Sequence, residues 1–317
     1  MDTDERARQP SCMQIARSCV SLDSAAGGNL VVISPCRDEA QTLPRTIASM
    51  KAQTRPPALW VIVDDGSTDE TPAILARAAR EIPWMRVVRR DNRGFRKLGG
   101  GVIDAFYAGL VTVDIEYGFV AKMDVDLEFS PHYLEHVLEL FESDPLLAAA
   151  SGKVYRYADD ALVEEFMIDE MVAGQFKLYR RNAFEAIGGF VREVMWDGID
   201  FHSARMAGWR TTSFHDSELR IVHLRAMGSS DRTVYRGRLR WGRGQWFMGS
   251  CFPYVLASAV FRMKERPWIV GGFLIAAGYL AAAFARAPRY HDLAFRKQLR
   301  RWQYRRLADV LRGRGAR

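Results

Sequence analysis

Three acidic residues, Asp124, Asp126 and Glu128, occupy alternate positions at the end of an apolar run. If the run is a β-strand, the alternation of side chains places all three carboxylates on one face where the strand ends. Carboxylates this close repel one another unless a cation lies between them. Hard oxygen ligands at this spacing suit Mg²⁺ or Mn²⁺, ions that usually carry the phosphates of a substrate. The alternative is a strand that ends in a solvated acidic turn.

Two further groups of polar residues lie far along the chain from these acids. Asp197 and Asp200 lie at the start of a predicted short helix that stops at Gly208. An N-cap role would explain Asp197, but it does not explain why Asp200 lies in the same turn. His223 ends a short apolar run and is a candidate metal ligand. A lone histidine in such a place is more often a hydrogen-bonded structural residue, so both interpretations stay open.

The segments before these polar residues have the pattern of buried strands and helices. Residues 29–35 and 58–63 are short apolar runs, and each leads through a polar loop into a segment with helix start signals. Gly66 permits a tight turn after the second run. This repeated strand–helix order predicts an α/β fold with a mostly parallel sheet, in which ligands bind at the carboxyl ends of the strands.

A glycine-rich basic loop over residues 91–101 precedes another predicted helix. Backbone amides at a helix start, with Arg93, Arg96 and Lys97 nearby, would make a clamp for a diphosphate, whereas the alternative is a solvated basic loop. The chain has no G-x-x-x-x-G-K-[ST] motif, which excludes a P-loop NTPase. No G-x-G-x-x-G follows the first predicted strand, which argues against a dinucleotide-dependent dehydrogenase.

The positive charge of the chain is concentrated in its tail. The 317 residues carry a net charge of +7, but residues 286–317 hold 11 Lys and Arg against 2 Asp and Glu. The tail is therefore +9 and the rest −2, a distribution that does not indicate nucleic-acid binding across the fold. The four cysteines form no C-x-x-C pair, which fits a reducing compartment and argues against structural zinc.

The C-terminal third changes in character. Residues 268–285 form a stretch of 18 residues without charge. This length is at the lower limit for a membrane-spanning helix. A helical hairpin that lies on or dips into one leaflet fits equally well, with the basic tail on anionic headgroups at the cytoplasmic side. The alternative is a pair of helices packed over the sheet. The predicted organisation is a mobile extension without a signal peptide over 1–28, a catalytic domain over 29–235, and a helical, membrane-associated region over 236–317.

Three motifs together resemble family 2 of the glycosyltransferases, enzymes with the GT-A fold. They are VISPCRDE at residues 32–39, VIVDDGSTDET at residues 61–71 and MDVD at residues 123–126. The resemblance covers about residues 30–225. It implies a Rossmann-like, mostly parallel sheet with helices on both faces, and a nucleotide-diphospho-sugar as the donor.

On the matching positions, the resemblance assigns the donor-binding residues. Pro35, Arg37 and Glu39 would line the nucleoside pocket, and Asp65 would contact the base. Asp124 would lie against the ribose and the diphosphate. Lys97, from the basic loop, is retained as a candidate contact for the diphosphate.

The resemblance also assigns the metal ligand and the base. Asp126 would hold the metal, and Glu128 stands where polyprenyl-phosphate sugar synthases have Gln, which makes it a candidate second ligand. Asp197 matches the general base that takes the proton of the acceptor during inversion at the anomeric carbon. Trp196 stands where many members have Glu, so Asp200 is kept as the second candidate for the base.

The resemblance and the C-terminal region together lead us to expect a membrane-associated, metal-dependent, inverting transferase at the cytoplasmic face of the bacterial inner membrane, acting on a cell-envelope glycan or a lipid-linked acceptor. The Q-x-x-R-W motif of processive synthases is not intact, since GRLRW occupies residues 237–241, so we expect transfer of a single sugar. A first alternative is transfer to a polyprenyl phosphate held by the arginines at 232–243. A second is a non-catalytic scaffold that binds a nucleotide-sugar.

Overall fold

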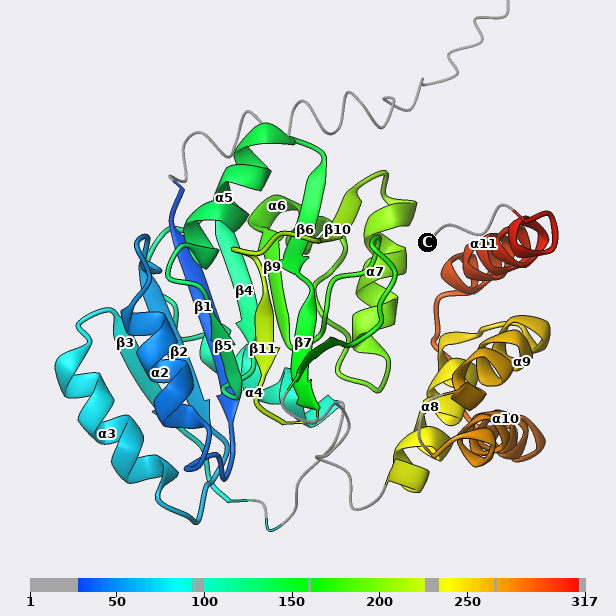
Figure 1. Cartoon of the computed structure of the whole chain (residues 1–317), viewed down its shortest axis with the longest axis horizontal. Coiled ribbons are helices and arrows are strands. Elements are labelled where there is room, and N and C mark those ends of the chain that lie inside the picture. Colours follow the sequence, from blue (N-terminus) through cyan, green and yellow to red (C-terminus); the bar gives the residue numbers. More distant parts are fainter. Residues whose placement is uncertain are drawn as a thin grey trace, which may run out of the picture.

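The computed structural model describes an α/β unit followed by a group of helices (Figure 1). Residues 1–27 of the predicted N-terminal extension, and Lys97 with Arg93 and Arg96, lie outside the described residues. The described residues are 28–92, 94, 100–158, 161–225, 234–264 and 267–313.

A seven-stranded sheet forms the centre of the α/β unit. Its order is β10-β6-β9-β4-β1-β2-β3, and β9 runs antiparallel to both of its neighbours. This confirms the predicted mostly parallel sheet. The strands are β1 (Leu30–Cys36), β2 (Leu59–Asp64), β3 (Met85–Arg89), β4 (Phe119–Met123), β6 (Leu147–Gly152), β9 (Phe176–Arg180) and β10 (Arg210–Phe214).

Helices cover both faces of this sheet, because its strands are apolar on both sides. In β1, Val32 packs into the core under one set of helices and Val31 into the core under the other. The first set is α2 (Leu43–Lys51), α3 (Thr71–Glu81) and α5 (Tyr133–Ser143). The second set is α4 (Gly100–Leu110), α6 (Arg181–Ala186) and α7 (Trp196–Met206).

A second, four-stranded sheet lies beside the first, with the order β5-β11-β7-β8. Its strands are β5 (Leu127–Phe129), β11 (Ile221–His223), β7 (Val154–Ala158) and β8 (Ala161–Glu164). The acidic stretch therefore does not continue one strand: β4 ends at Met123 in the first sheet, and β5 begins at Leu127 in the second. This break ends the simple alternation of side chains that was expected for the three acids.

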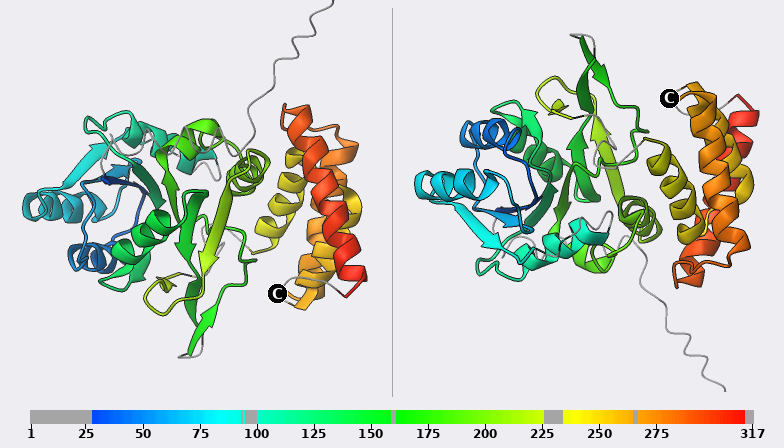
Figure 2. Two further views of the ribbon diagram at one scale, coloured as in Figure 1. Left: turned by 90° about the horizontal axis from the view of Figure 1, so that it is seen from above. Right: turned by 90° about the horizontal axis from the view of Figure 1, so that it is seen from below.

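The C-terminal helices gather beside α7, as two further views show (Figure 2). They are α8 (Val234–Met248), α9 (Phe252–Phe261) and α10 (Ile269–Phe284), with a 3₁₀ turn at Arg262–Lys264, and α11 (Leu293–Leu311). The helices α8 and α10 cross closely because glycines meet there. A Cβ on Gly242 would lie 2.0 Å from the carbonyl oxygen of Ile275, and one on Gly278 would lie 2.2 Å from that of Leu239.

An apolar cluster joins these helices to the α/β unit, since Ile199 of α7 packs against Met248, Phe295 and Leu299. Within the described ranges, no helix is both long enough and apolar enough to cross a bilayer. The 16-residue α10 occupies most of the uncharged stretch in which a spanning helix was considered. Contact of this region with a membrane surface stays a prediction.

Candidate functional site

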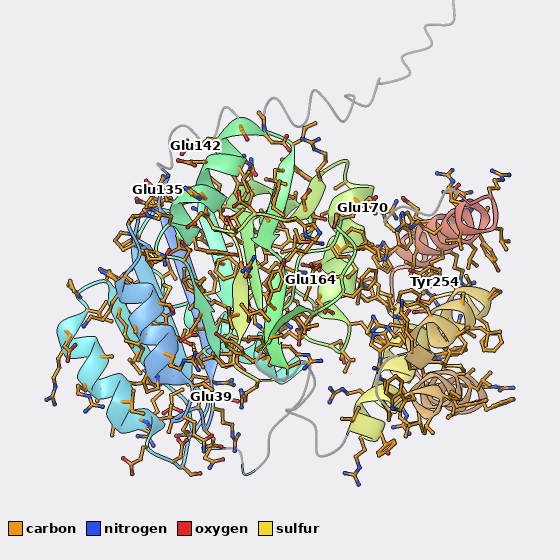
Figure 3. The ribbon with its side chains drawn as sticks, in the orientation of Figure 1. Glu39, Glu135, Glu142, Glu164, Glu170 and Tyr254 are labelled. Carbon is orange, nitrogen blue, oxygen red and sulfur yellow. The ribbon has the colours of Figure 1, made fainter. Side chains whose placement is uncertain are left out.

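The polar residues predicted to bind a donor follow three adjacent parallel strands. Cys36 of β1 pairs with Asp64 of β2, and Ile33 of β1 pairs with Lys122 of β4. The segments after these strands therefore emerge at one edge of the sheet, where Glu39 is labelled in Figure 3. This is the edge at which open α/β sheets bind their ligands.

Asp126 lies in a buried cluster of opposite charges. Arg225 donates to its Oδ2 from Nε at 3.0 Å and from Nη2 at 2.9 Å, and Nη2 also donates to Glu39 Oε1 at 2.6 Å. His223 Nε2 is 3.3 Å from the same Oδ2. Burial opposes ionisation of Asp126, but His223 and Arg225 outweigh it and lower the pKa of its carboxyl to about 2.

His223 is cationic at neutral pH in this arrangement. Burial favours the neutral imidazole, but hydrogen bonds and charge interactions with Asp126 and Glu165 outweigh burial and raise the pKa of His223 to about 9. The Nδ1 atom of His223 is 3.6 Å from Glu165 Oε2. His223 thus links a carboxylate at the end of β4 to another that follows β8.

The residues around Asp126 fit a divalent metal ion in one respect. Its Oδ1 atom is buried and has no hydrogen-bond partner, which leaves one carboxylate oxygen for an additional ligand. Carboxylate oxygens suit Mg²⁺ and Mn²⁺, and imidazole nitrogen is a further possible ligand once it is neutral. Asp126 and His223 are therefore the side chains that would hold such an ion.

Glu128 does not join them. Its carboxylate pairs with Arg45 of α2 through Nε and Nη2, each at 2.5 Å. Among the described residues, no group of three or more His, Cys, Asp and Glu side chains is arranged to hold a metal ion. The expectation that Glu128 shares a site with Asp126 is not met, because Arg45 engages both oxygens of the Glu128 carboxylate.

Asp124 is held at the same edge by a buried lysine. Lys122 Nζ donates to Asp124 Oδ1 at 2.5 Å and to the carbonyl oxygen of Gly174 at 2.7 Å. The side chain of Asp124 remains 32% exposed, whereas that of Lys122 is 2% exposed. Asp124 therefore presents its carboxylate to solvent at the strand ends, while the buried ammonium group of Lys122 balances its charge.

The two candidates for the base have different surroundings. Asp200 is buried, and it accepts from Lys177 Nζ at 2.9 and 2.7 Å and from the Tyr179 hydroxyl at 2.8 Å. Burial raises the pKa of Asp200, although Lys177 and Tyr179 oppose this. With its oxygens engaged inside the core, Asp200 is a structural partner of β9 and is not positioned to meet an acceptor.

Asp197 is partly exposed in the first turn of α7. The N-cap is Met195 and has no side-chain cap bond, so the N-cap explanation for Asp197 does not apply. Met195 is held at φ = 69°, a conformation that is uncommon for a residue other than glycine and is concentrated at functional sites. A Cβ on Gly174 would lie 3.5 Å from Asp197 Oδ2, which places Asp197 beside the backbone that binds Lys122.

The predicted nucleoside-pocket residues lie along the ends of β1 and β2. Arg37 donates to Asn92 Oδ1 at 2.9 Å, and Arg90 donates to Asp65 Oδ1 at 2.8 Å. Pro35 lies within β1, opposite Val63 of β2. The structure thus brings Pro35, Arg37, Glu39 and Asp65 to the same edge as Asp124 and Asp126. Their contacts with a donor stay a prediction.

Four charged residues of this region were not predicted from the sequence. Arg225 lies two residues after His223, so strand alternation would have placed both side chains on one side. Lys122 and Lys177 each interrupt an apolar strand, and a lysine in such a place needs a buried partner. No sequence signal identified Glu165 as the partner of His223.

Comparison with known proteins shows a likeness to one family of transferases over nearly half of the chain. Residues 31–178 match the profile described as Glycosyl transferase family 2. Glycosyltransferase AglD of Haloferax volcanii is 29% identical over 214 residues, which are 60% of this chain and 33% of AglD. The beta-monoglucosyldiacylglycerol synthase of Nostoc sp. is 28% identical over 160 residues, which are 45% of this chain and 33% of the synthase. The chain therefore spans about a third of the length of these two relatives.

A solved structure extends the likeness to nearly the whole chain. The mannosyltransferase PcManGT from Pyrobaculum calidifontis, in complex with GDP-Man and Mn²⁺, has a TM-score of 0.50 and 18% sequence identity. The likeness covers 95% of this chain and 98% of that chain. At this identity the comparison shows the fold alone, and that fold is the one the sequence motifs implied.

Proposed function

We propose that the chain is a glycosyltransferase of family 2, whose profile residues 31–178 match, and that it moves a single sugar, with inversion, from a nucleotide-diphosphate donor to a cell-envelope glycan or lipid-linked acceptor. The observation that carries the proposal is the convergence of charged residues at one sheet edge. Asp124 and Asp126 follow β4, and Glu39 follows β1. Asp197 of α7 lies beside Gly174, whose carbonyl oxygen accepts from Lys122.

The donor would lie along this edge. Pro35, Arg37 and Glu39 would line the nucleoside pocket, Asp65 would contact the base, and Asp124 would lie near the ribose. A divalent ion on Asp126, when bound, would neutralise the charge that develops on the leaving diphosphate. The buried Oδ1 of Asp126 supports this assignment because it has an unused acceptor site in the structure.

Asp197 would be the general base. Inversion needs a proton acceptor on the face of the sugar opposite the leaving group, within hydrogen-bond reach of the attacking hydroxyl. Asp197 is partly exposed, whereas Asp200 is engaged by Lys177 and Tyr179. We therefore assign the base to Asp197 and a structural role to Asp200.

The acceptor is proposed from the relatives and from the basic C-terminal region. One relative is named as a monoglucosyldiacylglycerol synthase, whose product is a glycolipid by its name. An acceptor presented at the cytoplasmic face of the bacterial inner membrane is consistent with the basic tail. A polyprenyl phosphate is the second candidate acceptor, and it is favoured by four arginines on α8, Arg236, Arg238, Arg240 and Arg243.

A panel of UDP-, GDP- and dTDP-sugars, assayed with and without Mn²⁺ for thermal stabilisation and for release of nucleoside diphosphate, tests the proposal. We expect one nucleotide class to stabilise the protein and to be turned over in a metal-dependent way. Adding a short-chain polyprenyl phosphate or a diacylglycerol to the active donor distinguishes the two acceptor classes. If a donor binds but is neither hydrolysed nor transferred to any of the acceptors, the chain is a binding scaffold. If no donor binds, the proposal fails.

A further inference from the structure

An open cavity of ≈ 390 Å³ lies along α11 and the segment that joins it to α10. None of its lining residues belongs to the candidate site at the ends of β1, β2 and β4, which we call the strand-end site. Its α11 residues recur at helical spacing and so form one face of that helix. We call this cavity the basic pocket, and it is lined by Arg289, Leu293, Arg296, Lys297, Arg300, Arg301 and Tyr304.

The basic pocket has five cations and no carboxylate in its lining. None of the five forms an ion pair with another residue in the part of the chain that the structure describes. The Nε atoms of Arg289 and Arg296 are buried and have no hydrogen-bond partner, which is costly for a charged group. Burial, followed by the nearby charges of Arg300 and Arg296, lowers the pKa of the Arg289 guanidinium. An anion in the pocket would relieve both costs.

The cations are held in place by contacts with the end of α8. The guanidinium of Arg289 lies 3.5 Å from the centroid of the Trp246 ring. Arg300 Nε donates to the carbonyl oxygen of Gly249 at 2.9 Å, and this bond uses one of its five donors. A Cβ on Gly249 would lie 2.6 Å from Arg296 Cδ, so the methylenes of Arg296 rest against this glycine. A site fixed before its ligand arrives loses little entropy when the ligand binds.

The surroundings of the basic pocket indicate an anion attached to an apolar body. Leu293 and Tyr304, in its lining, are 71% and 54% exposed, and Phe284 at the end of α10 is 85% exposed. Exposed apolar residues continue along α10, at Phe273 and Leu280. Planar guanidinium groups suit phosphate oxygens, and exposed apolar side chains beside cations suit a membrane interface.

We propose that the basic pocket binds the phosphoryl headgroup of an anionic membrane lipid, with the apolar residues beside it against the acyl chains. The site would hold the C-terminal helices on the membrane. The inference does not rest on the transfer reaction, because it concerns residues outside the strand-end site. It also explains the concentration of positive charge on α11 by a ligand rather than by solvation alone.

Flotation with vesicles of phosphatidylcholine, with or without phosphatidylglycerol, tests the proposal on the full chain without donor or acceptor. We expect binding to the mixed vesicles, and an affinity lower by about tenfold or more in Arg296→Gln/Arg301→Gln, since each cation at an anionic surface contributes about 1 kcal/mol. The matched control, Arg305→Gln/Arg306→Gln, removes the same charge from α11 outside the basic pocket. It should change the affinity by less than about threefold, because exposed charges away from the surface are screened. Thermal melting of both variants establishes that they are folded.

Several results would overturn the proposal. Equal losses in the two double variants would mean that only the net charge of α11 matters. Equal binding of the wild type to both kinds of vesicle would remove the anionic headgroup from the account. If inorganic phosphate binds the wild type but not the pocket variant, while the mixed vesicles bind both alike, the ligand is a soluble phosphate and the lipid assignment is wrong.

Discussion

Replacing Asp200 by Asn tests the distinction between a structural acid and a catalytic one. The side chains of Lys177 and Asp200 are 1% and 0% exposed, and Lys177 Nζ is 2.7 Å from Asp200 Oδ2. Removing the charge of one member of a buried pair leaves the other uncompensated, which costs about 3–5 kcal/mol. Asn keeps one oxygen as an acceptor for Tyr179, so we expect the lower end, about 3 kcal/mol. With an unfolding entropy of about 2.1 cal/mol/K per residue over 317 residues, the melting temperature would fall by about 4–5 °C.

The assay is thermal and urea unfolding followed by circular dichroism, with Asp197→Asn as the matched control. Asp197 is partly exposed, so its loss should change the free energy of unfolding by less than about 0.5 kcal/mol. Replacing both members, Lys177→Met with Asp200→Leu, should restore part of the lost stability, because an apolar pair needs no compensation. An Asp200→Asn variant with wild-type stability would refute the reasoning that this pair is structural.

Two further predictions concern the cluster around Asp126. Asp126→Ala should abolish metal-dependent donor binding, because it removes the oxygen with an unused acceptor site; titration calorimetry with and without Mn²⁺ measures this, and wild-type affinity would remove the metal assignment. Since the pKa of His223 is raised to about 9, metal coordination by its imidazole should release about one proton at pH 7.5. Calorimetry in buffers of different ionisation enthalpy measures that proton, and its absence would show that His223 is not a ligand. The stabilising pairing of His223 with Asp126 is complete below the ordinary histidine pKa and is lost as the pH rises through about 9.

The sequence predicted the strands and the edge of the sheet at which the polar residues meet. Apolar runs such as residues 29–35 were predicted to be buried strands, and strands are found there. The motifs that follow these runs predicted that Glu39, Asp65 and Asp124 lie at the ends of the strands. These features depend on local pattern, which the sequence shows directly.

The sequence could not predict contacts between residues far apart in the chain. Arg225 reaches Asp126 across 99 positions, and Lys177 neutralises Asp200 from a different element. Glu128 was expected beside Asp126 because alternation was assumed to continue, but Arg45 of α2, which is 83 positions away, engages its carboxylate. The partner of a buried charge depends on tertiary packing. The local sequence pattern therefore predicted which acidic residues matter but not which residues pair with them.

The rate of nucleoside diphosphate release by Asp197→Asn, measured together with its donor affinity, tests the central claim most directly. With an active donor and saturating Mn²⁺, we expect affinity within about twofold of the wild type and a rate lower by about 10²–10⁴, the usual contribution of a general base. A rate equal to that of the wild type would contradict the assignment of Asp197 as the base. A parallel loss of donor affinity would instead place Asp197 in donor binding, and the account of the site would then be wrong.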